Sequence, residues 1–200
     1  RAEWDSDPPA ERAARLSRAG APALGVTLDT APDGELLARS NHVLKSYWAQ
    51  PEATADALAD DWFHTGDGAT ISDDNFATIT DRKKDVIISG GENVSSIEVE
   101  DTLFSHPAVA EVAVIGVPDE KWGETIKALV VLAPDFGTGL DAGGQPDEQA
   151  LIDHCREKLA HFKCPTSVEF RDELARTATG KLQKFKLRAP YWEGMAKQIN

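Results

Sequence analysis

The sequence predicts an α+β fold with a mixed or antiparallel sheet flanked by helices. Helix-like and strand-like segments alternate along the chain, but the segments joining the strands differ in length, which argues against a purely parallel sheet. The composition, 41% hydrophobic and 28% charged over 200 residues, is typical of a globular protein. The longest apolar run, residues 128–133, has the length of a strand and is far shorter than the ~20 residues of a membrane-spanning helix.

The first half of the chain is predicted to contain two helices, a strand and an antiparallel hairpin. Residues 10–18 have a helical pattern, and residues 51–58 begin with proline, which favours the first position of a helix. Residues 35–39 follow a Pro-Asp-Gly turn and are expected to form a strand. Residues 68–72 and 76–80 flank the sequence Asp-Asp-Asn and are expected to pair as a hairpin.

The second half begins with a strand at residues 85–88 and a glycine loop at residues 89–93. A helix follows, because Ser95 and Glu98 have the spacing of a capping box, and it is expected to stop at His106 before a proline.

The remaining elements alternate strands with polar loops and helices. In order, they are strands at 109–117 and 126–133, a Gly/Pro/Asp loop at 134–146, an amphipathic helix with Leu151, Cys155, Leu159 and Phe162 on one stripe, a strand at 167–170, and a polar loop at 176–184 that opens a short basic helix.

The charge balance argues against a general nucleic-acid binder. The chain has 21 basic and 34 acidic residues, a net charge of −13, whereas duplex affinity depends mainly on Lys and Arg paired with phosphates. Residues 160–200 differ, with eight basic and four acidic residues. This segment is expected either to meet a compact anion or to be a solvated basic tail.

The two cysteines, Cys155 and Cys164, match no metal-binding spacing, so we predict a reducing compartment and no metal site. The first 20 residues include several acids and no hydrophobic stretch, so no signal peptide is predicted. G-x-S-x-G, H-E-x-x-H and Walker phosphate-loop motifs are all missing from the sequence, which therefore contains no complete active site of these kinds.

Four local features are unusual, but each has an ordinary structural interpretation. Residues 65–67, Thr-Gly-Asp, are typical of a turn, and residues 82–85, Arg-Lys-Lys-Asp, of a solvated charge run. Residues 89–91, Ser-Gly-Gly, form either a simple turn or a place where a ligand touches backbone. Lys181 alone would be a surface lysine.

The order and spacing of these features decide between the interpretations. The motifs are W-F-H-T-G-D at 62–67, D-R-K-K-D-V-I-I-S-G-G-E-N-V at 81–94, I-E-V-E at 97–100, H-P-A-V-A-E-V-A-V-I-G-V-P-D at 106–119, W-G-E at 122–124 and T-A-T-G-K-L-Q-K at 177–184. The series strongly resembles the carboxyl-terminal part of the acyl-CoA synthetases of the adenylate-forming superfamily, and the resemblance extends from about Gly34 to Arg188.

The resemblance implies a fold, an activity and a division of the chain. Residues 1–81 would be the end of a large amino-terminal domain, including a remnant of its β-barrel subdomain, and residues 82–200 a small mobile lid. Such enzymes join a carboxylate to ATP, forming acyl-AMP and pyrophosphate, and then transfer the acyl group to coenzyme A. Mg²⁺ accompanies ATP, with its ligands expected in the large domain.

The resemblance also implies roles for individual residues. Asp67 would hold the ribose hydroxyls, because a carboxylate accepts two hydrogen bonds and donates none, and Arg82 would contact the ribose and phosphate region. Lys181 would be the catalytic lysine that bridges the substrate carboxylate and the α-phosphate.

Lys84 would be the hinge at which the small domain rotates between the two half-reactions. Gly90 and Gly91 would line the pantetheine channel, where a side chain would block it. Trp122, Gly123 and Glu124 belong to a family hallmark and are assigned a structural role.

The family's phosphate loop, adenine pocket and acyl tunnel lie in the large domain that this sequence lacks, so the 200-residue chain alone is predicted to be inactive. The preferred substrate is a fatty or related carboxylic acid. The protein is expected in the cytoplasm or at the periphery of a membrane, with no transmembrane segment and no nucleic-acid partner. Two alternatives stay open: a ligase for another acid or acceptor, such as an aryl acid or a carrier protein, and a non-catalytic interaction module with the lid fold.

Overall fold

The computed structural model describes residues 4–134 and 146–195 and divides the chain into two compact units. The first unit comprises Arg1–Lys83 and the second Lys84–Asn200, so the division falls two residues after the boundary expected from the sequence. Most of the Gly/Pro/Asp loop predicted at 134–146 lies outside the described residues. No helix in the described part of the chain is long and apolar enough to cross a membrane.

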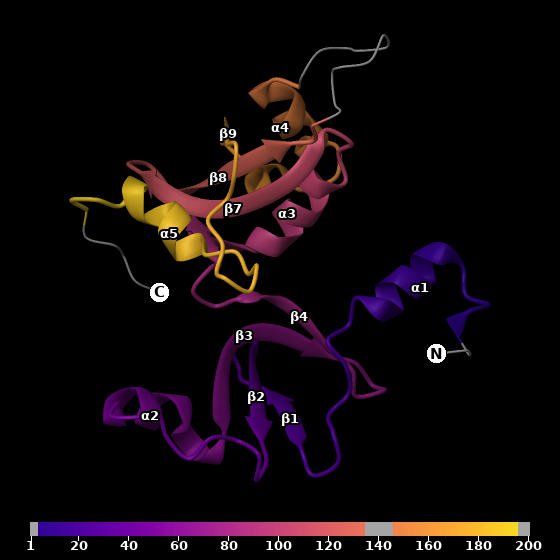
Figure 1. The fold of residues 1–200 in the computed structure, drawn as a ribbon, viewed down its shortest axis with the longest axis vertical. Coiled ribbons are helices and arrows are strands. Elements are labelled where there is room, and N and C mark those ends of the chain that lie inside the picture. Colours follow the sequence, from indigo (N-terminus) through magenta and orange to yellow (C-terminus); the bar gives the residue numbers. More distant parts are fainter. Residues whose placement is uncertain (1–3, 135–145, 196–200) are drawn as a thin grey trace. The chain divides into compact units, whose positions relative to one another are not determined.

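The first unit is built on a four-stranded antiparallel sheet (Figure 1). Its strands are adjacent in the order of the chain. In sequence its elements are α1 (Pro9–Leu16), β1 (Thr27–Thr30), β2 (Glu35–Arg39), α2 (Pro51–Ala57), a 3₁₀ turn (Ala59–Asp61), β3 (Phe63–Ile71) and β4 (Ala77–Arg82).

The predicted strand at 35–39 is confirmed, and both predicted helices are present with ends shifted by one or two residues. The hairpin is also confirmed, but β3 begins at Phe63, five residues earlier than expected. Asn75 supplies the left-handed conformation of its turn, with a φ of 60°. Strand β1 was not predicted because it is short and almost fully exposed, so its sequence shows no apolar alternation.

The second unit contains a five-stranded mixed sheet, which confirms the α+β class. Strands β6, β5, β8 and β7 are antiparallel neighbours in that order, and β9 runs parallel to β8. Its elements are β5 (Ile87–Ser89), β6 (Glu92–Val94), α3 (Ser96–Phe104), β7 (Val109–Asp119), β8 (Gly123–Leu132), α4 (Glu148–Arg156), a 3₁₀ turn (His161–Lys163), β9 (Ser167–Phe170), α5 (Lys184–Arg188) and a final 3₁₀ turn (Ala189–Tyr191).

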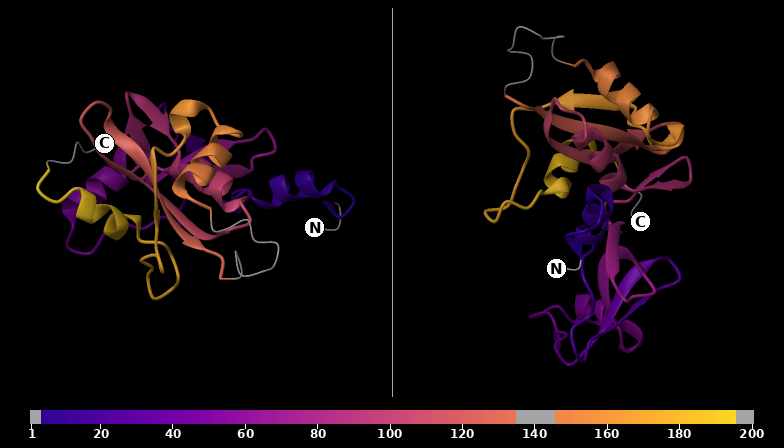
Figure 2. Two further views of the ribbon diagram at one scale, coloured as in Figure 1. Left: turned by 90° about the horizontal axis from the view of Figure 1, so that it is seen from above. Right: turned by 90° about the vertical axis from the view of Figure 1, so that its right-hand side faces the viewer.

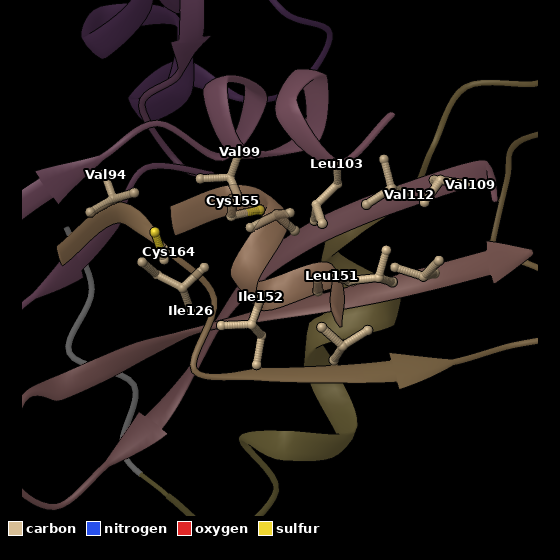
Figure 3. Packing of buried hydrophobic residues seen from close by; sticks show 14 of the residues in the cluster. Val94, Val99, Leu103, Val109, Val112, Ile126, Leu151, Ile152, Cys155 and Cys164 are labelled. Atoms are coloured by element: carbon tan, nitrogen blue, oxygen red, sulfur yellow. The ribbon is translucent and has the colours of Figure 1, made fainter. Parts of the chain in front are cut away.

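Helices cover both faces of the β7–β8 pair, and Figure 2 shows α4 and α5 on opposite sides of it. Because side chains alternate along a strand, Val112 and Val114 of β7 face one way, whereas Ala113 and Ile115 face the other. The first face packs against α3 and α4 in the main core, which Figure 3 shows around Leu103 and its neighbours. The second face packs against a smaller cluster that includes side chains of α5 and the turn after it.

The structure corrects several details of the second unit. Strand β7 ends at Asp119, two residues later than expected, and β8 begins at Gly123, three residues earlier, and ends at Leu132. The strand expected at 85–88 runs from Ile87 to Ser89, and the glycine loop is a two-residue turn that leads directly into β6. Helix α4 ends at Arg156, so Leu159 and Phe162 lie beyond it and do not extend the apolar stripe. Leu159 still packs against the core, but Phe162 is 49% exposed.

Candidate functional site

Asp67 lies in a bulge of strand β3 rather than in a turn. Glu35 of β2 pairs with Gly68 and Leu37 pairs with His64, so three residues of β3 lie opposite the single residue Leu36. Such a bulge bends a strand and re-aims its side chains. Gly66, at its centre, has a φ of 76°, which an L-residue adopts only with strain.

Side-chain hydrogen bonds hold this bulge together. The Thr65 hydroxyl donates to the Leu36 carbonyl oxygen at 2.7 Å, and the Asp67 backbone N–H donates to Thr65 Oγ1 at 3.2 Å. The bulge therefore fixes the backbone on both sides of Gly66.

Arg82 is the cross-strand partner of Asp67. The two residues are in register on β3 and β4, and Arg82 Nε donates to Asp67 Oδ1 at 3.1 Å. The Asp67 side chain is 32% exposed and that of Arg82 is 70% exposed. Solvent therefore reaches both charged groups, and the guanidinium can donate to further partners.

Beneath this pair lies a buried carboxylate, that of Glu35, whose side chain is 7% exposed. Oε1 accepts the backbone N–H of Gly66 at 2.8 Å, while Oε2 lies 3.0 Å from His64 Nδ1 and 3.1 Å from Lys83 Nζ. Lys83 Nζ also donates to Asp33 at 2.7 Å.

The electrostatics of this network favour its charged form. Burial raises the pKa of the Glu35 carboxyl, but hydrogen bonds from His64, Gly66 and Lys83 outweigh burial and the net pKa is lowered. The hydrogen bond to Asp33 raises the pKa of Lys83, burial opposes this, and Glu35 adds to the increase. The same hydrogen bond lowers the pKa of Asp33.

Lys84 is the first residue of the second unit and is exposed in the turn between β4 and β5. The backbone is hydrogen-bonded to the first unit on one side of this connection and to the second unit on the other. In the first unit, the Lys83 backbone N–H donates to the Gly66 carbonyl oxygen at 2.9 Å. In the second unit, the Arg188 guanidinium donates to the Lys84 carbonyl oxygen at 2.9 Å.

Gly90 and Gly91 form the turn between β5 and β6, with φ values of 61° and 88°. Two consecutive positive φ values are those of the tight hairpin turn that glycine favours. A Cβ at Gly90 would lie 2.7 Å from the Trp122 ring, whereas a Cβ at Gly91 would meet open space. Gly90 N–H also donates to the Trp122 carbonyl oxygen at 2.9 Å, so packing against Trp122 is one reason for glycine at this position.

Glu124, to which a structural role is assigned from the sequence, makes a contact between two strands. Strand β5 pairs with β8 through Ser89 and Gly123. Next to that pair, Glu124 Oε2 accepts the backbone N–H of Ile88 at 3.3 Å. The side chain therefore joins the two strands where their ladder is short.

Lys181 lies on a polar loop that closes on itself. Arg176 and Leu182 form an isolated bridge, Gly180 has a φ of 85°, and the Lys181 N–H donates to Thr177 Oγ1 at 3.0 Å. Arg176 also binds Glu111 of β7 at 2.6 Å, which attaches the loop to the sheet. Lys181 is exposed, and no salt bridge joins its ammonium to another residue within 4–134 or 146–195.

Lys184, three residues later in the same motif, has the opposite environment. Its ammonium lies 2.7 Å from Glu100 and donates to Ser96 Oγ at 2.7 Å. The Lys184 and Glu100 side chains are only 12% and 15% exposed. Lys184 thus attaches the start of α5 to α3, while Lys181 is left accessible.

The structure brings Asp67 and Arg82 together, whereas in the second unit Gly90 and Gly91 share one turn and Lys181 lies on a separate loop. The Glu35 network and the buried Lys184 pair were not identified from the sequence. For Glu35 a signal exists: it alternates with Leu37 on the buried side of a strand, and a carboxylate on such a face requires partners.

A family model matches residues 98–181 of the chain, that of the AMP-binding enzyme C-terminal domain. This range begins within α3, includes β7, β8, α4 and β9, and ends at Lys181.

Individual relatives match a longer part of the chain. It is 44% identical to the long-chain-fatty-acid–CoA ligase FadD13 of Mycobacterium tuberculosis, over 80% of this chain and 30% of that protein. It is 46% identical to a feruloyl-CoA synthase of an Amycolatopsis species, over 78% of this chain and 30% of that protein. The crystal structure of ATP-bound MatB from Rhodopseudomonas palustris superimposes with a TM-score of 0.79 at 34% identity, covering 88% of this chain and 36% of that one. The chain thus spans about a third of the length of the proteins that it matches.

Proposed function

We propose that the chain, whose residues 98–181 match the AMP-binding enzyme C-terminal domain and whose relatives include CoA ligases, is the carboxyl-terminal portion of an ATP-dependent acyl-CoA ligase. In the first half-reaction, a substrate carboxylate oxygen attacks the α-phosphorus of ATP, and the bond to the β-phosphate oxygen breaks to release pyrophosphate. In the second, the coenzyme A thiolate attacks the acyl carbonyl carbon and AMP leaves.

The contrast between two lysines of one motif carries this proposal. Lys184 is occupied by a buried ion pair, whereas Lys181 is exposed on a loop that Arg176 fastens to β7. An accessible ammonium on a loop that is fixed to the sheet is suited to stabilising negative charge at the α-phosphate. We therefore assign the adenylation role to Lys181.

Asp67 and Arg82 are suited to the ribose. Two ribose hydroxyls need acceptors, and the partly exposed Asp67 carboxylate supplies them without donating. Arg82 fixes one carboxylate oxygen and can direct its other N–H groups to the sugar or phosphate. The chemistry of this donor and acceptor set fits a nucleotide.

Lys84 is proposed as the hinge because the chain divides directly before it and it lies in an exposed turn. Gly90 and Gly91 are proposed to line the pantetheine channel in the thioester-forming conformation. The open space around the Cβ position of Gly91 leaves room for a ligand at that turn, and the half-exposed Trp122 ring beside Gly90 offers an apolar surface.

We place the rest of the active site, with the acyl tunnel and the Mg²⁺ ligands, in the two-thirds of the relatives' length that this chain does not span. Mg²⁺ would neutralise the phosphates of ATP when bound. The small apolar core of the first unit is consistent with contact to a larger domain: among its described residues, Leu37, Ala69 and Ala77 are the buried apolar side chains. Two free, buried cysteines are consistent with a cytoplasmic location.

A fatty or related carboxylic acid is the substrate we favour, since one relative is named for long-chain fatty acids. An aryl acid is the second candidate, because another relative of similar identity is named for feruloyl-CoA synthesis.

The test measures acid-dependent pyrophosphate release and thioester formation by the full-length enzyme with fatty and aromatic acids. Coenzyme A and a carrier protein are compared as acceptors. We expect activity with ATP and coenzyme A, and none from the 200-residue chain alone. Turnover by the isolated chain would contradict the assignment of the nucleotide pocket to another domain. Lack of turnover by the folded full-length protein with every acid would favour the non-catalytic module.

A further inference from the structure

Glu35 is a buried charged residue to which the proposed reaction assigns no role. A buried ion pair is weak evidence for stability, because replacement by well-packed apolar residues is often neutral or stabilising. The reason for a carboxylate at this position is therefore to be sought in the groups that it binds. Its partners lie immediately beside both residues of the proposed ribose site.

The first contact acts on Asp67. Glu35 Oε1 accepts the N–H of Gly66, the residue before Asp67, at 2.8 Å. On the same strand, His64 Nδ1 lies 3.0 Å from Oε2. The carboxylate therefore binds Gly66 within the bulge and His64 just before it, and so constrains the direction of the Asp67 side chain.

The second contact acts on Arg82. Glu35 Oε2 also accepts from Nζ of Lys83, the residue after Arg82, at 3.1 Å. The Lys83 backbone N–H in turn donates to the Gly66 carbonyl oxygen at 2.9 Å. One carboxylate thus joins the bulge of β3 to the residue that follows β4, and the Asp67–Arg82 pair is the next pair along the two strands.

We propose that Glu35 is a positioning residue that holds Asp67 and Arg82 in the geometry required by the ribose hydroxyls of ATP. This inference rests on the proposed function and adds to it a group that touches no substrate. Displacement of a binding group by about 1 Å can cost on the order of 10²-fold in rate, so a residue that fixes both partners has a measurable effect.

Glu35→Gln is the sharpest variant because it keeps the shape of the side chain. A carboxylate accepts on both oxygens, but an amide accepts only on one side and donates on the other. In either orientation of the amide, its NH₂ group faces a donor, either Gly66 N–H or the ammonium of Lys83. The variant therefore releases one of the two attachments.

The readout is ribose discrimination by the full-length ligase, measured as the ratio of kcat/KM for ATP to kcat/KM for 2′-deoxy-ATP and 3′-deoxy-ATP. In Glu35→Gln we expect KM for ATP to rise about 10-fold or more and the ratio to fall toward one. Each deoxynucleotide should be affected less than ATP, because each lacks one of the two hydroxyls that Asp67 binds. A purely structural role would lower all three values in parallel and leave the ratio unchanged, which would overturn the inference.

Two further variants separate this inference from the proposed function. Asp33→Asn is the matched control, because it removes a carboxylate that binds Lys83, while its amide oxygen can still accept the Glu35 backbone N–H as Asp33 Oδ1 does at 3.1 Å; it should retain the wild-type ratio. Asp67→Asn should abolish discrimination, and adding Glu35→Gln to it should change little. If Asp67→Asn leaves discrimination intact, the ribose assignment itself is wrong. If Asp67→Asn loses discrimination but Glu35→Gln retains it, the positioning role alone is wrong.

Folding is checked by the thermal transition of each variant. If Glu35→Gln does not fold, Lys83→Met removes the second attachment and leaves the Gly66 contact in place. It should reduce discrimination by a smaller factor, and a wild-type ratio in folded Lys83→Met would contradict the proposal.

Discussion

Replacing Lys184 with methionine tests whether the two lysines of the T-A-T-G-K-L-Q-K motif have separate roles. Methionine keeps most of the length of the side chain and removes the charge. In the structure, Lys184 binds both Glu100 and Ser96 at 2.7 Å, and the ion-pair side chains are 12% and 15% exposed. The change therefore leaves a nearly buried carboxylate without its cation.

The expected cost follows from that burial. Breaking a buried ion pair by removing one partner costs about 3–5 kcal/mol. Glu100 also accepts the backbone N–H of Val114 at 2.7 Å, so part of its charge stays solvated by the protein. We therefore expect the lower end, about 3 kcal/mol, which for a domain of roughly 120 residues corresponds to a fall in Tm of about 10–15 °C.

The assay is thermal and urea unfolding of the 200-residue chain with Lys184→Met, and with Lys181→Met as the matched control. Exposed substitutions usually change stability by no more than about 0.5 kcal/mol, so Lys181→Met should unfold like the wild type. Adding Glu100→Gln to Lys184→Met should cost little more than Lys184→Met alone, since the pair is already broken. Equal stability of the two single variants would refute the assignment of a structural role to Lys184 and a chemical role to Lys181.

Three further predictions concern the hinge, the glycine turn and a buried thiol. Lys84→Pro in the full-length enzyme should preserve acyl-AMP formation and suppress thioester formation, because a fixed φ stops the rotation; normal thioester formation by the folded variant would remove Lys84 from the hinge. Gly90→Ala should destabilise the chain by about 1 kcal/mol more than Gly91→Ala in urea unfolding, since both have positive φ but only the Cβ at Gly90 meets Trp122; equal losses would contradict that packing. Burial raises the pKa of Cys155 to about 12 from 9.0. Above pH 9 the unfolded chain loses a proton that the folded state keeps. The contribution of this thiol to the free energy of unfolding is therefore complete below pH 9, and it falls by up to about 1.4 kcal/mol per pH unit as the pH rises toward 12. A Cys155→Ala variant with the same alkaline slope would show that another group is responsible.

Local signals in the sequence were sufficient where an element depends on neighbouring residues. The spacing of Ser95 and Glu98 identified the start of α3, and in the structure Ser95 Oγ accepts the Glu98 N–H at 3.3 Å. The strand at 167–170 was predicted with its exact limits because apolar and polar residues alternate between two loops.

Features that depend on distant residues were not accessible to the same reasoning. The bulge that presents Asp67 exists because β2 pairs with β3 out of simple register, and the interpretation of residues 65–67 as a turn is wrong for this reason. Glu35 and Gly66 are 31 positions apart, and Lys184 and Ser96 are 88 apart. Their contacts are set by the packing of whole elements rather than by any local pattern.

The central claim, that this chain supplies the adenylation lysine of an acyl-CoA ligase, is tested most directly by separating the two half-reactions in full-length Lys181→Ala. The account predicts a loss of at least ~10²-fold in acid-dependent pyrophosphate release, with near-normal transfer to coenzyme A from supplied acyl-AMP. Equal losses in both half-reactions, or no loss in either, would contradict the role of Lys181 and with it the account.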